Sequence, residues 1–139
     1  MMNTRSLAQT LPDGLIAQPA AGDVPAVVGR LTEALAARGV QLFADIDHAA
    51  GARRVGLSLR PTRLLVFGDP RSGTPLMQAR QTVGIDLPLK ALVWQDADGT
   101  TWVGYTDPRW IAGRHRVGAH CPAVAAMTAA IENLLVRAN

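Results

Sequence analysis

Apolar residues recur with the period of an α-helix in two segments of the chain. In the first segment they occupy positions i, i+3, i+4, i+7 and i+11, which form one stripe of a helix. These residues are Val24, Val27, Val28, Leu31 and Leu35. Asp23 is a typical N-cap for this helix, and Gly39 is a typical residue to end it. The second stripe predicts a helix that begins near Cys121-Pro122 and contains Val124, Met127, Ile131, Leu134 and Leu135.

Short apolar runs between turn-forming residues predict the strands. They are residues 15–18, 40–46, 63–67, 87–95 and 100–105. The last two runs flank the turn 96–99, in which Gly99 can adopt a positive φ, and together they predict a β-hairpin.

Two shorter segments complete the predicted elements. Residues 47–56 are expected to form a helical turn or a loop. A short helix is expected from Thr74, with Pro75 in its first turn, to about Thr82. This order of elements, with strands joined by short turns, predicts an α+β fold: a two-layer sandwich of a mostly antiparallel sheet with helices packed on one face.

The chain of 139 residues has the size of one domain. Residues 1–13 are expected to be a flexible N-terminus, which leaves a single α+β domain over residues 14–139. No apolar run approaches the roughly 18 residues of a membrane span, and no signal-peptide core is present, so a cytoplasmic location without a membrane partner is expected. The single Cys121 excludes an internal disulfide.

The formal charge of +3 raises the question of a nucleic-acid partner. Thirteen of the 14 basic residues are Arg, and they are spread along the chain. The two clusters, 53–54 and 114–116, contain no interleaved aromatic residues of the kind that stack on bases. The sequence therefore disfavours nucleic-acid binding.

Residues 64–76, LLVFGDPRSGTPL, have the order strand, Gly-rich loop and helix start. Free backbone N–H groups and a helix dipole at such a loop favour an anion. Gly68, Gly73 and Thr74 resemble the outer frame of a phosphate-binding loop, but the Lys that such a loop needs before its final Thr is absent, so nucleotide hydrolysis is not predicted. Asp69 lies in this loop, and Arg71 could bind a carboxylate or phosphate. The alternative is a tight turn capped by Thr74.

A second candidate cluster consists of Asp45, Asp47 and His48. An Asp near a His can orient the imidazole for acid–base chemistry, and alternation places both carboxylates on one side of the strand. The alternative is a local turn contact between side chain and backbone.

The remaining residues with chemical potential fit no known signature. His115, His120 and Cys121 have no zinc-binding spacing, so neither a metal nor a cofactor is predicted. A surface His and a buried free thiol explain them, and Asp86 could cap a helix or pair with an Arg. The hairpin aromatics Trp94, Trp102 and Tyr105 are expected in the core or at a dimer interface.

Several ordered segments resemble the domain of unknown function 302 family. They are Asp45-Ile46-Asp47-His48, Leu59-Arg60-Pro61-Thr62, Leu65-Val66-Phe67-Gly68, Asp69-Pro70, Gly73-Thr74-Pro75-Leu76-Met77, Asp86-Leu87-Pro88-Leu89-Lys90, Trp94, Asp96, Asp98-Gly99 and Tyr105-Thr106-Asp107-Pro108. The resemblance implies an α+β sandwich that forms a homodimer in bacterial and archaeal relatives, and it implies no activity, cofactor or catalytic residue. Asp69 departs from the Asn that similar sequences often carry, and its added negative charge weakens the anion site.

The sequence leaves three hypotheses. The leading one is a non-enzymatic, dimeric domain that binds a small molecule where the Gly68–Thr74 loop meets the corner of Asp47 and His48. The second is an enzyme in which His48 acts as a general base oriented by Asp45 or Asp47. The third is a structural interaction module whose dimer interface contains the hairpin aromatics.

Overall fold

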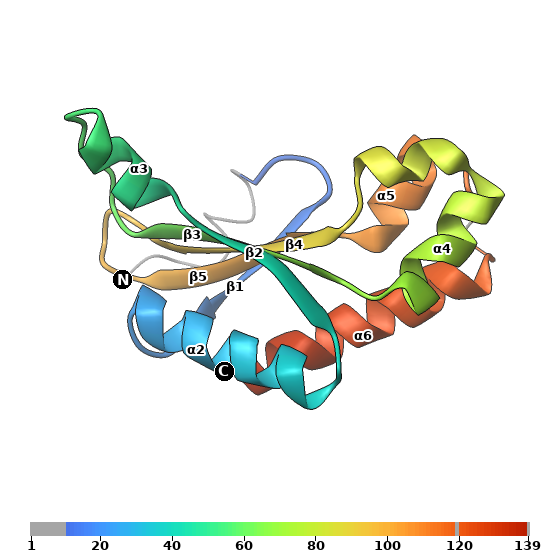
Figure 1. Ribbon diagram of the computed structural model, residues 1–139, viewed down its shortest axis with the longest axis horizontal. Helices are drawn as coiled ribbons and strands as arrows, with labels where there is room; N and C mark the ends of the chain where they lie inside the picture. The colour runs from blue at the N-terminus through green and yellow to red at the C-terminus, as the bar shows by residue number, and fades with distance from the viewer. Residues whose placement is uncertain (1–10, 119, 139) are drawn as a thin grey trace.

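A five-stranded antiparallel sheet forms the centre of the molecule (Figure 1). The computed structural model describes residues 11–118 and 120–138, so most of the predicted flexible N-terminus lies outside the described residues. The strands are β1 (Leu15–Ala20), β2 (Gln41–Asp47), β3 (Thr62–Gly68), β4 (Leu89–Gln95) and β5 (Thr101–Thr106). Their order across the sheet is β1-β5-β4-β3-β2, and all neighbours are antiparallel.

The helices divide into two long ones along the sheet and shorter ones at its ends. They are α2 (Val24–Ala37), α3 (His48–Arg54), α4 (Pro70–Ala79), the 3₁₀ helix η1 (Gln81–Ile85), α5 (Pro108–Arg114) and α6 (Pro122–Ala138). Figure 1 shows α2 and α6 along one face of the sheet, α3 at one end, and α4 and α5 at the other. The predicted α+β class is therefore confirmed.

Helix α2 follows its predicted pattern closely. Its five stripe residues are all buried, and they pack with α6 and the inner face of the sheet in the main core. The Asp23 carboxylate accepts a hydrogen bond from the Ala26 N–H at 2.9 Å, which caps the helix as predicted. Gly39 has a φ of +68°, the left-handed conformation that commonly follows a helix.

The predicted hairpin is formed by β4 and β5. In its turn, the Asp96 carboxylate accepts hydrogen bonds from the backbone N–H groups of Asp98 and Thr100, both at 2.9 Å, and from Trp102 Nε1 at 2.8 Å. Trp102 is buried and stacks on Trp94, with ring centroids 6.4 Å apart. These contacts join the turn to the aromatic pair, so this Asp has a structural role.

The prediction for the fourth helix was wrong at its start. Helix α4 begins at Pro70, and Asp69 is its N-cap, so the Gly68–Thr74 segment is mostly helix and Thr74 caps nothing. Pro75 lies inside the helix. Asp69-Pro70 and Thr74-Pro75 are both acceptable helix starts, each with a capping residue before a Pro. Asp is the stronger N-cap of the two, which favours the start at Pro70.

Helix α5 was not predicted. Asp107 caps it, and Pro108 occupies its first turn. The same tripeptide, Asp-Pro-Arg, therefore begins both α4 and α5, and in each case the Arg bonds back to the capping carboxylate. This repeated signal could have revealed both helix starts.

Candidate ligand-binding site

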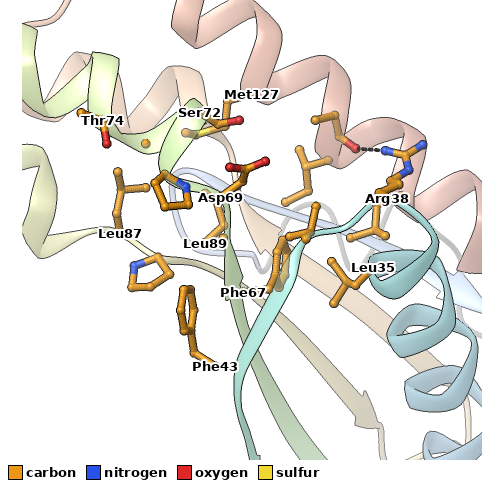
Figure 2. A pocket seen from close by; sticks show the side chains of 18 of the residues that line it. Leu35, Arg38, Phe43, Phe67, Asp69, Ser72, Thr74, Leu87, Leu89 and Met127 are labelled. Atoms are coloured by element: carbon orange, nitrogen blue, oxygen red, sulfur yellow. Dashed lines mark hydrogen bonds between the residues drawn. The ribbon is translucent and has the colours of Figure 1, made fainter.

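A cavity of about 300 Å³ lies where α4, α6, the C-terminal end of α2 and one end of the sheet meet (Figure 2). It is located between two apolar clusters. One is the main core under α2 and α6, and the other is a smaller core among α4, η1, α5 and the first half of α6. Side chains of both clusters form its walls, among them Leu35, Phe67, Met127, Leu87 and Ile131. The cavity is therefore lined mainly by aliphatic and aromatic groups.

Small residues leave the space that the cavity occupies. Gly68 and Gly73 both line it. A Cβ at Gly73 would lie 3.4 Å from Leu87 Cδ1, and a Cβ at Gly68 would lie 3.4 Å from Phe43 Cε2. A larger side chain at Gly73 would have to extend into the cavity or displace these neighbours.

Asp69 is the carboxylate of the cavity wall, and it is already paired. Its oxygens accept hydrogen bonds from the backbone N–H, Nε and Nη2 of Arg71 at 2.7–3.1 Å. The Arg71 side chain, through these bonds, holds the pKa of Asp69 below its usual value, so the carboxylate stays ionised at neutral pH. Arg71 itself is largely exposed and does not line the cavity.

Arg38 is the cation of the cavity wall, and sequence reasoning did not identify it. It caps the C-terminal end of α2, and its Nη1 donates to the Ala130 carbonyl of α6 at 3.1 Å, as Figure 2 shows. Within residues 11–118 and 120–138, no carboxylate pairs with it. No local signal could have found it, because Ala130 is 92 positions away.

Asp47 and His48 lie far from this cavity. In the β2–β3 register Asp47 pairs with Arg63, whereas Gln41 pairs with Gly68. Asp47 and Gln41 are six positions apart on β2, so Asp47 lies about 20 Å from the end of the sheet at Gly68, at about 3.3 Å per residue. The single corner expected to join Asp47 and His48 to Gly68–Thr74 is therefore not formed, although Gly68, Asp69, Gly73 and Thr74 do line the cavity.

The geometry around His48 does not assemble an acid–base pair. His48 is exposed at the first position of α3. The Asp47 carboxylate accepts from the Ala50 N–H at 2.9 Å, and this bond lowers the pKa of Asp47. Asp45 pairs with Arg63. Both carboxylates are engaged elsewhere, which corresponds to the local-contact alternative for Asp47.

A different histidine forms a hydrogen-bonded chain. His115 Nε2 lies 2.5 Å from Asp86 Oδ2, and its Nδ1 lies 3.0 Å from Thr82 Oγ1. Arg114 donates to the second oxygen of Asp86 at 2.7 Å. The His115 side chain is 8% exposed, so it is not the surface residue that was expected. These hydrogen bonds join the C-terminal end of α5 to η1 and to Asp86, which immediately precedes the cavity residue Leu87.

The other expected positions carry no assembled site. His120 is exposed, and Cys121 is a half-buried free thiol. Among the described residues, no three His, Cys, Asp or Glu side chains are close enough to hold a metal ion. Tyr105 belongs to the main core.

Residues 16–135 match the family described as "Domain of unknown function DUF302". The chain belongs to the DUF302 family. A crystal structure of an uncharacterised conserved DUF302 protein from Bacillus stearothermophilus has the same fold, with a TM-score of 0.82 and 21% sequence identity. The alignment covers 92% of this chain and all of that one. The resemblance to DUF302 stated from the sequence is thus confirmed.

Two curated relatives of this DUF302 chain carry the name of a channel. "Fluoride-specific ion channel FluC 1" of Brucella suis biovar 1 (strain 1330) is 39% identical over 112 residues, which are 81% of this chain and 44% of the relative. The protein of the same name from Brucella abortus biovar 1 (strain 9-941) matches equally, over 42% of its length. This chain spans less than half of either relative. Within the part of the chain that the structure describes, no helix is long and apolar enough to cross a membrane.

Proposed function

We propose that this DUF302 domain binds one small, mainly apolar molecule in the cavity between α4, α6 and the end of β3, and that it does so without catalysing a reaction. The observation that carries this proposal is the cavity itself. Its volume of about 300 Å³ is at the lower end of the range of ligand pockets.

The lining supports an apolar ligand. Each methylene group that leaves water for such a wall contributes about 0.8 kcal/mol, so a chain of several carbons gains useful affinity without many polar contacts. A general-base role for His48 is not part of the proposal, because His48 lines neither this cavity nor the smaller hollow beside Asp86. Fluoride-channel activity is not part of it either, since the chain covers less than half of the relatives with that name.

Occlusion of the cavity tests the proposal. The variant Gly73→Leu places a branched side chain at the cavity wall. Gly29→Leu is its matched control, because Gly29 is exposed in α2 and no atom beyond its chain neighbours and its own helix backbone lies within 4 Å of its Cβ position. Fluorescence titration with the neutral apolar probe N-phenyl-1-naphthylamine should give saturable 1:1 binding to the wild type and to the control. The occluded variant should bind at least about tenfold more weakly. Equal binding by all three proteins, or no saturable binding to the wild type, would refute the proposal.

We further propose that two copies associate through the outer face of the sheet, opposite α2 and α6. Ile46, Leu64 and Leu92 are register neighbours on this face, and Ile46 is 42% exposed. Five strands about 4.8 Å apart and about 20 Å long present about 500 Å² per partner, so a dimer would bury about 1,000 Å², the lower limit for a specific interface.

Light scattering at micromolar concentration tests the association. Leu92→Lys should convert a wild-type dimer to a monomer, because it replaces an apolar side chain beside Leu64, on the central strand of this face, by an unpaired charge. Val136→Lys, on an exposed position of α6, should leave the dimer intact. A monomeric wild type at tens of micromolar would overturn this second proposal.

A further inference from the structure

We infer that the cavity selects an amphipathic anion, whose apolar chain packs between α4 and α6 and whose acidic head is bound by Arg38. This inference rests on the proposed ligand-binding function and adds the chemical class of the ligand. Carboxylates, sulfonates and phosphates share the chemistry that a guanidinium recognises.

Two charged side chains line the cavity, Asp69 and Arg38, and their unused hydrogen-bonding capacity decides whether the head group of the ligand is anionic or cationic. An ionised carboxylate can accept about four hydrogen bonds, and three N–H groups of Arg71 already occupy both oxygens of Asp69. A cationic head would find about one acceptor position of this carboxylate open, and it would meet the positive charge of Arg71 beside it. Asp69 is therefore a poor anchor for an ammonium group.

Arg38 is in the opposite situation. Of the five N–H donors of a guanidinium, the structure assigns one, to the Ala130 carbonyl. This bond holds the side chain at the rim of the cavity, where α2 and α6 meet (Figure 2). Within residues 11–118 and 120–138 the remaining donors have no partner, and an acidic head can accept two of them at once.

A second donor is present in the wall. The Ser72 hydroxyl lines the cavity from α4 and has no hydrogen-bond partner among the described residues. The other polar side chains of the wall are those of Thr74 and Asp69, and the Asp69 carboxylate repels an acidic head, so such a head is expected beside Arg38. With its acidic head bound to Arg38, the ligand would place its apolar chain against Phe67, Met127 and Leu87.

Ligands that share one chain and differ only in the head test the inference. Octanoate, octan-1-ol and octylammonium should each be titrated at pH 7 against protein loaded with N-phenyl-1-naphthylamine. Octanoate should displace the probe at a concentration about tenfold or more below that of octan-1-ol, because charge-assisted hydrogen bonds are stronger than neutral ones. Octylammonium should be the weakest of the three, since it meets the unpaired Arg38.

Variants identify the group responsible. Arg38→Gln should remove the advantage of octanoate and leave octan-1-ol unchanged, whereas Arg38→Lys should keep part of it. Arg137→Gln, which makes the same change in net charge on the exposed last turn of α6, should behave as the wild type. Unchanged affinity for the neutral probe checks that each variant is folded.

The outcomes separate the two proposals. Equal affinity for octanoate and octan-1-ol, tighter binding of octylammonium, or an octanoate advantage that persists in Arg38→Gln would overturn the assignment of an anionic ligand while the apolar site stands. If neither the probe nor any of the three compounds binds, the proposed function itself fails.

Discussion

Replacing Leu76 by Ala should destabilise the protein more than an alanine at any other position of α4. Leu76 is the buried side chain of this helix and belongs to the smaller core beside the cavity. The helix also contains Gly73 and Pro75. Relative to Ala, these two residues disfavour a helix interior by about 1 and about 3 kcal/mol, so α4 depends on its tertiary contacts.

The magnitude follows from the atoms removed. Leu76 is 2% exposed, and the change to Ala deletes three carbon atoms. Their transfer accounts for about 2.4 kcal/mol, and an incompletely relaxed cavity adds up to about 2 kcal/mol. We therefore expect a loss of about 3 kcal/mol in the free energy of unfolding, which for a chain of this length lowers Tm by about 10 °C.

Urea denaturation followed by tryptophan fluorescence measures this loss, and Leu57→Ala is the matched control. Leu57 is 65% exposed, so the same chemical change there should cost less than about 0.5 kcal/mol. A loss below about 1 kcal/mol at Leu76, or equal losses at both positions, would refute the view that this side chain anchors α4. Both variants should keep the m-value of the wild type, because only then do the denaturation midpoints report differences in the free energy of unfolding.

Three further predictions concern other contacts. Asp96→Ala should lower the free energy of unfolding at neutral pH, because the hydrogen bond from Trp102 lowers the pKa of the Asp96 carboxyl below 3.8. The stability that this carboxylate contributes is therefore complete above its unfolded-state pKa and is lost as the pH falls through its lower folded-state pKa. Urea melts of the variant and the wild type should differ less and less over that fall in pH. His115→Ala should cost about 2 kcal/mol in urea denaturation, because it removes a ring that is 8% exposed and the hydrogen bond of that ring to the Asp86 carboxylate. His48→Ala, on the exposed start of α3, should cost less than about 0.5 kcal/mol, and the reverse order would contradict the assigned geometry. Gly14→Ala should lower Tm by several degrees, since Gly14 has a φ of +81° and a Cβ there would lie 2.5 Å from the Trp110 ring; an unchanged Tm would contradict this packing.

The sequence by itself determined the elements whose signals are local. The period of 3.6 residues and the cap at Asp23 identified α2, and a turn with Gly99 identified the β4–β5 hairpin. These predictions succeeded because burial of one face imposes its period on the sequence. The start of α4 was not determined in this way, because Asp69-Pro70 and Thr74-Pro75 are both acceptable helix starts and the packing of Leu76 contributes to the choice.

Only the tertiary structure decided which of the candidate residues share a site. The Gly68–Thr74 segment was identified from its composition, but its cavity also needs α6 and the end of α2, which are distant in the chain. Asp47 and Gly68 end consecutive strands, and the antiparallel pairing of these strands places them at opposite ends of the sheet. Arg38 reaches the cavity by its bond to α6, 92 residues later. Local patterns report which face of an element is buried, whereas a site depends on which elements meet, and that is determined by strand register and helix packing.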